Sequence, residues 1–249
     1  MAGCGINQVA KNLVQHKSKE EYVHEIFSTI AERYDPLNSL FSFGQDKFWR
    51  QFAIRQTGLK TGGSGLDVCC GTGMFAIEQA KVVGLQGKVV GLDFCESMLA
   101  VARKNITKTP YVDVIELVSG NAINLPFAKG TFDCATIGFA LRNVPDIPKT
   151  IAEMARVVRP GGKVVSLELS KPTAPVFKHL YFLYFNYLLP VIGRLGAGIN
   201  GPYRYLPDSL KDFPGLEEIK EIFNLVGLKD VYYSMLTGGV VSVHVGTVA

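Results

Sequence analysis

The spacing of apolar residues changes near residue 65, where a helical period gives way to alternating short and long apolar runs. Between residues 21 and 56 the apolar positions recur every three or four residues, as in a helix that is buried on one face. The segment RYDPLNSLFSFGQD interrupts this period with Pro36 and Gly44. The pattern therefore predicts two helices joined by an aromatic loop. The apolar positions that define them are Val23, Ile26, Phe27, Ile30, Phe48, Trp49 and Phe52.

Short apolar runs after residue 65 have the length and composition of buried strands. They cover residues 66–70, 88–93, 112–118, 131–140 and 163–169. Amphipathic segments between them predict a helix over 73–83, a second that starts from Ser97 as N-cap, and a third over 146–158. Because each helix returns the chain to the same end of the sheet, we expect a doubly wound, parallel α/β sheet.

The order of elements changes near the C-terminus. Residues 216–228 have the pattern of an amphipathic helix, and 229–236 and 240–248 have the pattern of strands. The short linker between these strands, which contains Gly238 and Gly239, favours a hairpin. We therefore expect a mostly parallel, seven-stranded sheet with an antiparallel hairpin at one edge.

The composition predicts a substantial core and a weakly charged surface. Of the 249 residues, 47% are hydrophobic and 19% are charged, and the formal net charge is +4. The basic residues are scattered, which argues against nucleic acid as a partner but allows a mild attraction to an anionic membrane. The N-terminus lacks the apolar core of a signal peptide, and no run reaches the roughly 20 apolar residues of a membrane span. A cytoplasmic protein is expected.

The five cysteines show no CxxC spacing and no companion pair of histidines. This pattern predicts neither a disulfide framework nor a metal site, and it is typical of a reducing compartment. Cys69 and Cys70 end the first apolar run, and a disulfide between neighbours would strain the peptide. We interpret both as small, soft packing residues.

The sequence LDVCCGTG places Gly71 and Gly73 directly after the first predicted strand, and Ala76 completes a loose G-x-G-x-x-G/A pattern. Glycines here let the backbone turn tightly and approach a ligand at the start of a helix. Asp93 ends the second strand about 20 residues later, where an acidic side chain meets the ribose hydroxyls of an adenosine. A glycine turn without a ligand, and an aspartate that only caps the next helix, are the alternatives.

Two classes of adenosine-binding enzyme share this arrangement, namely NAD(P)-dependent oxidoreductases and S-adenosylmethionine-dependent methyltransferases. Three features favour the second class. Asp67 lies inside the first strand, where it can hold the loop and reach the amino-acid end of the cofactor. The segment GNAINLPF supplies Asn121 and the Ala122 amide for an adenine edge. The antiparallel edge hairpin is the methyltransferase variation on this sheet.

Several longer segments are more specific than the glycine loop. In chain order they are FSTIAERYDPLNSLFSFGQDKFWR, LDVCCGTG, GNAINLPF, TFDCATIGFALRNVPD, EMARVVRPGGKVVSLELSKP and YRYLPDSLKDFP. Together they closely resemble the ubiquinone/menaquinone biosynthesis C-methyltransferase family over roughly residues 20–248. The resemblance implies a class I methyltransferase fold, and transfer of a methyl group from S-adenosylmethionine to a ring carbon of a prenylated quinol. It assigns the cofactor to Thr72, Asp93, Asn121 and Ala122, with Gly71 and Gly73 shaping the loop.

Two positions depart from related sequences. Cys69 stands where the wider methyltransferase pattern usually has glycine, and Gly138 stands where some family members carry serine. The resemblance favours demethylmenaquinol as the acceptor. A benzoquinol of the ubiquinone pathway, another lipid or small aromatic, and a non-catalytic scaffold in a quinone-biosynthesis complex are the alternatives.

Methylation of a ring carbon needs an electron-rich quinol, ideally its phenolate. For a phenol with a pKa of about 10, ionisation at pH 7 costs about 4 kcal/mol. Arg142 and Asn143 follow the fourth strand at the ligand edge, where a guanidinium can stabilise the phenolate or orient a water that takes the proton. An ion pair between Arg142 and a carboxylate such as Asp146 is the alternative. His24 and His179 are alternative bases.

The N-terminal helices and the most apolar segment of the chain have predicted roles around the acceptor. Tyr34, Phe41, Phe43 and Trp49 are expected to cover the ring and exclude water, with Tyr34 bonding a quinol oxygen; ordinary helical packing is the alternative. Residues 177–195 fit a groove for a prenyl chain, a peripheral contact with the inner face of the membrane, a homodimer interface or internal packing.

These expectations divide a single domain, residues 1–249, into several parts. Residues 20–56 form the helical N-terminal lid and 65–170 the cofactor-binding core. Residues 172–212 form a cap insert, and 214–249 form the C-terminal helix and hairpin.

Overall fold

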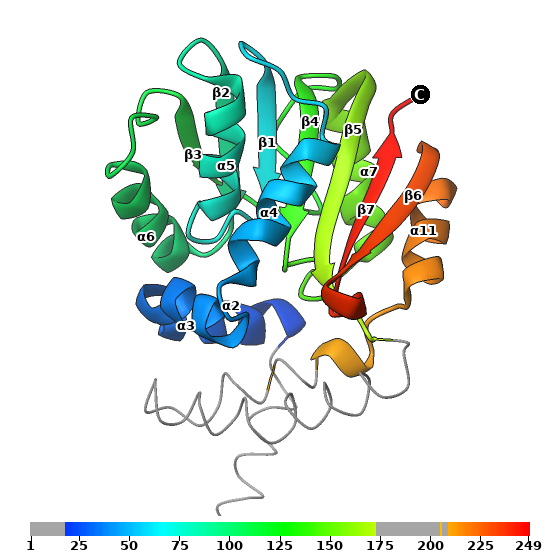
Figure 1. The fold of residues 1–249 in the computed structure, drawn as a ribbon, viewed down its shortest axis with the longest axis horizontal. Helices are drawn as coiled ribbons and strands as arrows, with labels where there is room; N and C mark the ends of the chain where they lie inside the picture. The colour runs from blue at the N-terminus through cyan, green and yellow to red at the C-terminus, as the bar shows by residue number, and fades with distance from the viewer. Residues whose placement is uncertain (1–17, 173–204, 206–208) are drawn as a thin grey trace, which may run out of the picture.

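A computed structural model describes residues 18–172, 205 and 209–249. Its centre is a seven-stranded sheet with the order β3-β2-β1-β4-β5-β7-β6 (Figure 1). The β5–β7 and β7–β6 pairs are antiparallel and the other neighbours are parallel, so the predicted sheet with its edge hairpin is confirmed. The strands are β1 (Ser64–Val68), β2 (Lys88–Asp93), β3 (Ile115–Ser119), β4 (Phe132–Gly138), β5 (Val158–Leu169), β6 (Lys229–Leu236) and β7 (Val241–Thr247).

Helices cover both faces of this sheet (Figure 1). One face carries α4 (Gln45–Gln56), α5 (Met74–Val83) and α6 (Glu96–Ile106). The opposite face carries α7 (Ile147–Val157) and α11 (Leu216–Leu225). Two further helices, α2 (Lys19–Ile30) and α3 (Tyr34–Phe41), lie beyond the carboxyl ends of the strands and are joined by a 3-10 turn over Ala31–Arg33.

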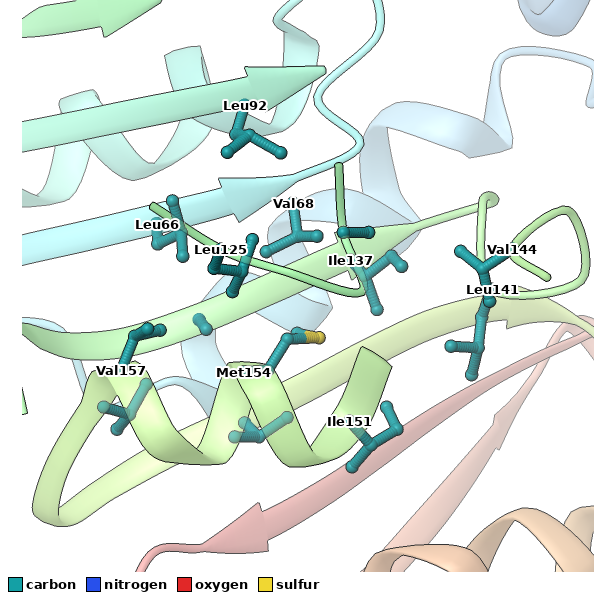
Figure 2. Close-up of a cluster of buried hydrophobic side chains, with 14 of the residues drawn as sticks. Leu66, Val68, Leu92, Leu125, Ile137, Leu141, Val144, Ile151, Met154 and Val157 are labelled. Atoms are coloured by element: carbon teal, nitrogen blue, oxygen red, sulfur yellow. The ribbon is translucent and has the colours of Figure 1, made fainter. Parts of the chain in front are cut away.

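The core between the sheet and α7 is built from regularly spaced apolar side chains (Figure 2). Ile151, Met154 and Val157 lie on one side of α7, three residues apart, and are completely buried. They pack against strand residues from β1, β2 and β4, including Leu66 and Ile137. This packing fixes the strand ends relative to one another, which is what a site at those ends requires.

The N-terminal segment contains one more helix than the sequence predicts. The predicted aromatic loop includes α3, in which Pro36 is the third residue. A helix leaves its first four N–H groups without intrahelical partners, so proline costs little at this position. The interruption at Gly44 is confirmed, because Gly44 has a φ of +74° and precedes α4 directly.

Several predicted boundaries were wrong. The predicted strand 112–118 is β3 from Ile115 to Ser119, and the predicted strand 163–169 begins earlier, at Val158. Two further differences lie at the site. The first strand ends at Val68 rather than Cys70, because Cys69 adopts a left-handed φ of +56° and turns the chain out of the sheet. Ser97 is not the N-cap of α6, which starts at Glu96 after Cys95. The Cys95 N–H instead donates to Asp93 Oδ1 over 2.9 Å, so a side chain from the strand end satisfies this helix start.

Among the described residues, no helix is long and apolar enough to cross a membrane. The predicted cap insert is described only at residues 172, 205 and 209–212, and the apolar segment 177–195 lies outside the described residues.

Candidate active site

A pocket opens at the carboxyl ends of β1, β2 and β4, beneath α2. Together with its mouth it holds about 680 Å³ of open space, within the range of small-molecule sites. The predicted site residues that line it are Tyr34, Gly71, Asp93, Asn121, Ala122 and Asn143. Asp67 and Thr72 line a smaller pocket on the other side of the glycine loop. The predicted residues are therefore gathered at one edge of the sheet, although Gly73 and Arg142 line neither of these two pockets.

The glycine loop needs glycine at two positions for different reasons. Gly71 and Gly73 have φ values of +54° and +80°, which disfavour other residues. A Cβ on Gly73 would also lie 3.2 Å from the Cβ of Ala102 in α6. The loop therefore packs closely on α6, and Gly73 shapes it without facing the larger pocket.

Asp93 holds the loop in place from the end of β2. Its Oδ2 accepts from the Gly71 N–H over 2.8 Å, and its Oδ1 accepts from the Cys95 N–H over 2.9 Å. Burial raises the pKa of Asp93, and these backbone bonds oppose that rise. A carboxylate offers about four acceptor positions, so Asp93 retains capacity for two ligand hydroxyls.

Asp67 links the first strand to the helix that follows the loop. Its Oδ2 accepts from the Ala76 N–H over 3.0 Å, and its Oδ1 accepts from the Thr136 hydroxyl over 3.2 Å. Burial raises the pKa of Asp67 to about 8. Near neutral pH this carboxyl is therefore mostly protonated in the protein without ligands.

The raised pKa of Asp67 predicts a pH-dependent stability. In the unfolded chain the carboxyl loses its proton near pH 4, whereas the folded protein keeps it to about pH 8. The contribution of Asp67 to stability is thus complete below pH 4 and is lost as the pH rises through 8. Relative to Asp67→Asn, the wild-type free energy of unfolding should fall by up to about 1.4 kcal/mol per pH unit in this window.

Urea unfolding of both proteins from pH 5 to 9 measures this difference. The difference in the free energy of unfolding between the two proteins should level off above pH 8. Because both proteins carry the same other titrating groups, the contributions of those groups cancel in this difference. Parallel curves across the whole range would show that Asp67 is ionised throughout.

Asn121 and Ala122 follow β3, the strand next to β2, and line the larger pocket together with Asp93. Asn121 Oδ1 accepts from the Ile123 N–H over 3.1 Å, and its Nδ2 donates to Glu20 Oε1 of α2 over 3.2 Å. Ala122 is 6% exposed and belongs to the core beneath the pocket. The lid helix α2 is thereby tied to the segment predicted to meet the adenine.

Thr72 makes a contact that the sequence did not predict. Its hydroxyl donates to Asp35 Oδ1 of α3 over 2.7 Å, and Asn105 Nδ2 donates both to Asp35 Oδ2 and to the Thr72 carbonyl. Thr72 is buried and faces the smaller pocket. Asp35 lies inside the segment that the sequence analysis interpreted as an aromatic loop interrupted by Pro36 and Gly44, and no local pattern marked it as a partner of Thr72.

Arg142 is buried behind the pocket wall and does not line it. Its Nη1 donates to Glu168 Oε1 over 2.5 Å and to the Phe139 carbonyl over 2.7 Å. Glu168 Oε2 also accepts from the Arg142 backbone N–H over 3.2 Å. The alternative of an ion pair was correct in kind, but the partner is Glu168; Asp146 instead caps α7 by accepting from the Lys149 N–H.

Tyr34 and Asn143 are the two predicted acceptor-side residues that line the pocket. Asn143 Oδ1 accepts from the Tyr205 hydroxyl over 2.9 Å, a partner that the sequence did not indicate. Burial raises the pKa of Tyr34, although the nearby charge of Arg142 opposes this rise. Tyr34 is therefore a neutral hydrogen-bonding group near pH 7.

The aromatic residues predicted to form the lid divide into different environments. Phe43 is 79% exposed, and Trp49 is buried in the core beneath α4, where its Nε1 donates to Thr237 Oγ1 over 2.8 Å. Phe41 packs against core residues. Of the four, Tyr34 lines the pocket, and α2 adds Glu20, Val23 and Phe27 to the lining.

Of the two candidate histidine bases, His24 lies among the described residues. The His24 ring lies 5.6 Å from the Phe94 ring, measured between centroids, and His24 does not line the pocket. His179 lies outside the described residues.

Cys69 borders both pockets and has the left-handed backbone noted above. Glycine adopts this conformation without cost, whereas cysteine rarely does. Burial raises the pKa of the Cys69 and Cys70 thiols well above their ordinary value, so both stay protonated and unreactive. The described cysteines are free thiols, and the described residues contain no cluster of three or more acidic, cysteine or histidine side chains that could hold a metal ion.

Gly138 lies between the two pockets at the end of β4. A Cβ at this position would lie 2.5 Å from Cδ2 of Phe75. The Phe75 ring of α5 therefore occupies the space that a serine side chain at this position would need.

This strand order, with an antiparallel seventh strand inserted beside the fifth and a glycine turn after the first, defines the class I methyltransferase fold. Solved structures share it. One is a possible histamine N-methyltransferase from Thermotoga maritima, which is 18% identical, has a TM-score of 0.64, and matches over 91% of this chain and 100% of that chain.

The chain belongs to the ubiE/COQ5 methyltransferase family, whose family model matches residues 15–248. The demethylmenaquinone methyltransferase of Desulfitobacterium hafniense is 49% identical over 92% of this chain and 91% of its own length. The demethylmenaquinone methyltransferase of Shouchella clausii is 46% identical over 92% of this chain and 97% of its own length. The protein is thus a methyltransferase.

Proposed function

We propose that the protein transfers a methyl group from S-adenosylmethionine to a ring carbon of demethylmenaquinol, a prenylated quinol. The observation that carries this proposal is the 49% identity to a demethylmenaquinone methyltransferase, which extends over 92% of the chain. The acceptor is the reduced quinol because a neutral quinone ring is electrophilic and does not attack a methyl donor.

The residues at the pocket fit an adenosine-containing methyl donor. Asp93 presents a buried carboxylate with remaining acceptor capacity, and Asn121 and Ala122 line the same pocket. The glycine loop between the two pockets allows close approach of a ligand to the backbone. Bound here, S-adenosylmethionine supplies an electrophilic methyl group on a sulfonium.

The residues on the acceptor side bind and orient the quinol. Tyr34 and Asn143 line the pocket and can hydrogen-bond ring oxygens. Arg142 is a positioning residue, because its guanidinium is bonded to Glu168 and to the Phe139 carbonyl at the turn that carries Asn143. The apolar side chains of α2 exclude water, which favours a reaction in which opposite charges disappear.

We propose further that the enzyme works in the cytoplasm and contacts the inner face of the membrane, since a prenylated acceptor is drawn from the bilayer. A homodimer stays a prediction, as does the tail groove assigned to residues 177–195.

The acceptor is tested with purified protein, S-adenosylmethionine and each quinol in detergent. Methyl transfer to demethylmenaquinol, detected by mass spectrometry as a product heavier by one methyl group, is the expected result. The oxidised quinone is the matched control and should not react. Preference for a demethylated benzoquinol would assign the ubiquinone pathway, and donor binding without transfer to either quinol would contradict both assignments.

A further inference from the structure

A second, smaller pocket lies on the other side of the glycine loop from Asp93 and Asn121. With its opening it holds about 380 Å³. It shares a wall with the larger pocket, so the two form adjoining arms of one site. The residues common to both are Tyr34, Cys69, Gly71, Gly138 and Phe139.

Arg50 supplies the guanidinium of this second arm. It lies on α4, is 7% exposed, and lines the pocket together with Asp67 and Thr72. Its Nη1 donates to Asp46 Oδ2 over 2.7 Å. Arg50 has five N–H donors, and Asp46 is its only acceptor among the described residues. The guanidinium therefore keeps hydrogen-bonding capacity at a wall that a ligand can reach.

The environment holds Arg50 in a fixed position. Asp46 also accepts from the hydroxyls of Ser42 over 3.1 Å and Ser39 over 3.3 Å. Hydrogen bonds and the charge of Arg50 lower the pKa of Asp46 despite its burial, so the carboxylate is ionised and orients the guanidinium. A cation that is oriented before the ligand arrives loses little freedom on binding.

We propose that Arg50 binds the α-carboxylate of the methionine part of S-adenosylmethionine. This inference rests on the proposed function, in which the adenosine part occupies the arm at Asp93. The amino-acid end then enters the adjoining arm, where Arg50 is the cationic side chain that lines the pocket. A guanidinium matches the planar, two-oxygen geometry of a carboxylate.

A purely structural role for Arg50 makes a different prediction. If the guanidinium only neutralises Asp46 and holds α3 against α4, its loss should lower the affinity for every ligand of the site to the same degree. If it binds the carboxylate, its loss should weaken only ligands that carry one.

Two ligands separate these possibilities by calorimetry. S-adenosylhomocysteine carries the carboxylate, and its decarboxylated analogue, 5′-deoxy-5′-(3-aminopropylthio)adenosine, lacks only that group. Arg50→Gln should raise the dissociation constant of S-adenosylhomocysteine about 10- to 100-fold, which is the loss typical of a hydrogen bond to a charged group. It should change the dissociation constant of the analogue by less than about 2-fold. Arg55→Gln, an exposed arginine on the same helix, is the matched control and should change neither.

Equal weakening of both ligands by Arg50→Gln, or no weakening of S-adenosylhomocysteine, would overturn the inference. If circular dichroism shows that Arg50→Gln does not fold, Arg50→Lys keeps the charge opposite Asp46 and removes the planar fork. The affinity of this variant for S-adenosylhomocysteine should fall about 10-fold, and its affinity for the analogue should not change. An equal loss of affinity for both ligands would again overturn the inference. Wild-type protein that binds neither ligand would contradict the proposed function itself.

Discussion

Replacing Glu168 with leucine is expected to lower the free energy of unfolding by about 3–5 kcal/mol. Glu168 is 1% exposed and accepts from Arg142 Nη1 and from the backbone N–H groups of Arg142 and Leu169. Without it, a buried guanidinium has no counter-charge and two backbone donors lose their acceptor. Urea unfolding followed by the fluorescence of Trp49, the single tryptophan, measures the loss.

Two further variants test the cause of this loss. Glu96→Leu breaks an exposed pair with Arg103 and should change stability by less than about 0.5 kcal/mol. The double variant Arg142→Met/Glu168→Leu removes both buried charges and should recover much of the stability, without recovering activity. A change below about 1 kcal/mol for Glu168→Leu alone would show that water reaches the pair.

Asp93→Asn is expected to weaken S-adenosylhomocysteine binding by roughly 100-fold or more. The carboxylate accepts two backbone N–H groups and is placed to accept two ligand hydroxyls, and hydrogen bonds to a charged group are each worth about 1.5–3 kcal/mol. An amide offers one oxygen, so its NH₂ group would face the N–H of Gly71 or Cys95. Calorimetry gives the dissociation constant directly.

The same variant should remain folded, because burial already raises the pKa of Asp93 and the neutral amide removes a buried charge. Asp113→Asn, on an exposed residue before β3, is the control and should bind like the wild type. A loss of only about 3-fold for Asp93→Asn would mean that the ribose hydroxyls bind elsewhere.

The sequence predicts best the strands and helices in which buried residues recur at a regular spacing along the chain. The predicted strands 88–93 and 229–236 coincide with β2 and β6 residue for residue. The helix α3 was missed because proline usually ends a helix, whereas Pro36 lies in the first turn, where its missing N–H is not needed. The end of β1 was misplaced because nothing local shows that Cys69 adopts a positive φ.

The contacts that shape the site join residues far apart in the chain. Arg142 and Glu168 are separated by 26 positions, and Asp35 and Thr72 by 37. Sequence spacing could place Arg142 at the ligand edge but could not show whether its side chain faces the pocket or the core. The orientation follows from the position of Glu168 on β5, which only the assembled sheet reveals.

The pairing of Gly138 with Phe75 gives the floor of the site a different chemistry from the one that a serine at this position would give. A phenyl ring beneath a bare backbone presents neither a hydroxyl donor nor a hydroxyl acceptor. An inhibitor that needs a hydrogen bond to a side chain at this position would lose that bond here. An inhibitor that places a flat, apolar group against the Phe75 ring would instead gain contact area. Compounds that distinguish this site from one with serine here can therefore be designed around a single hydroxymethyl group.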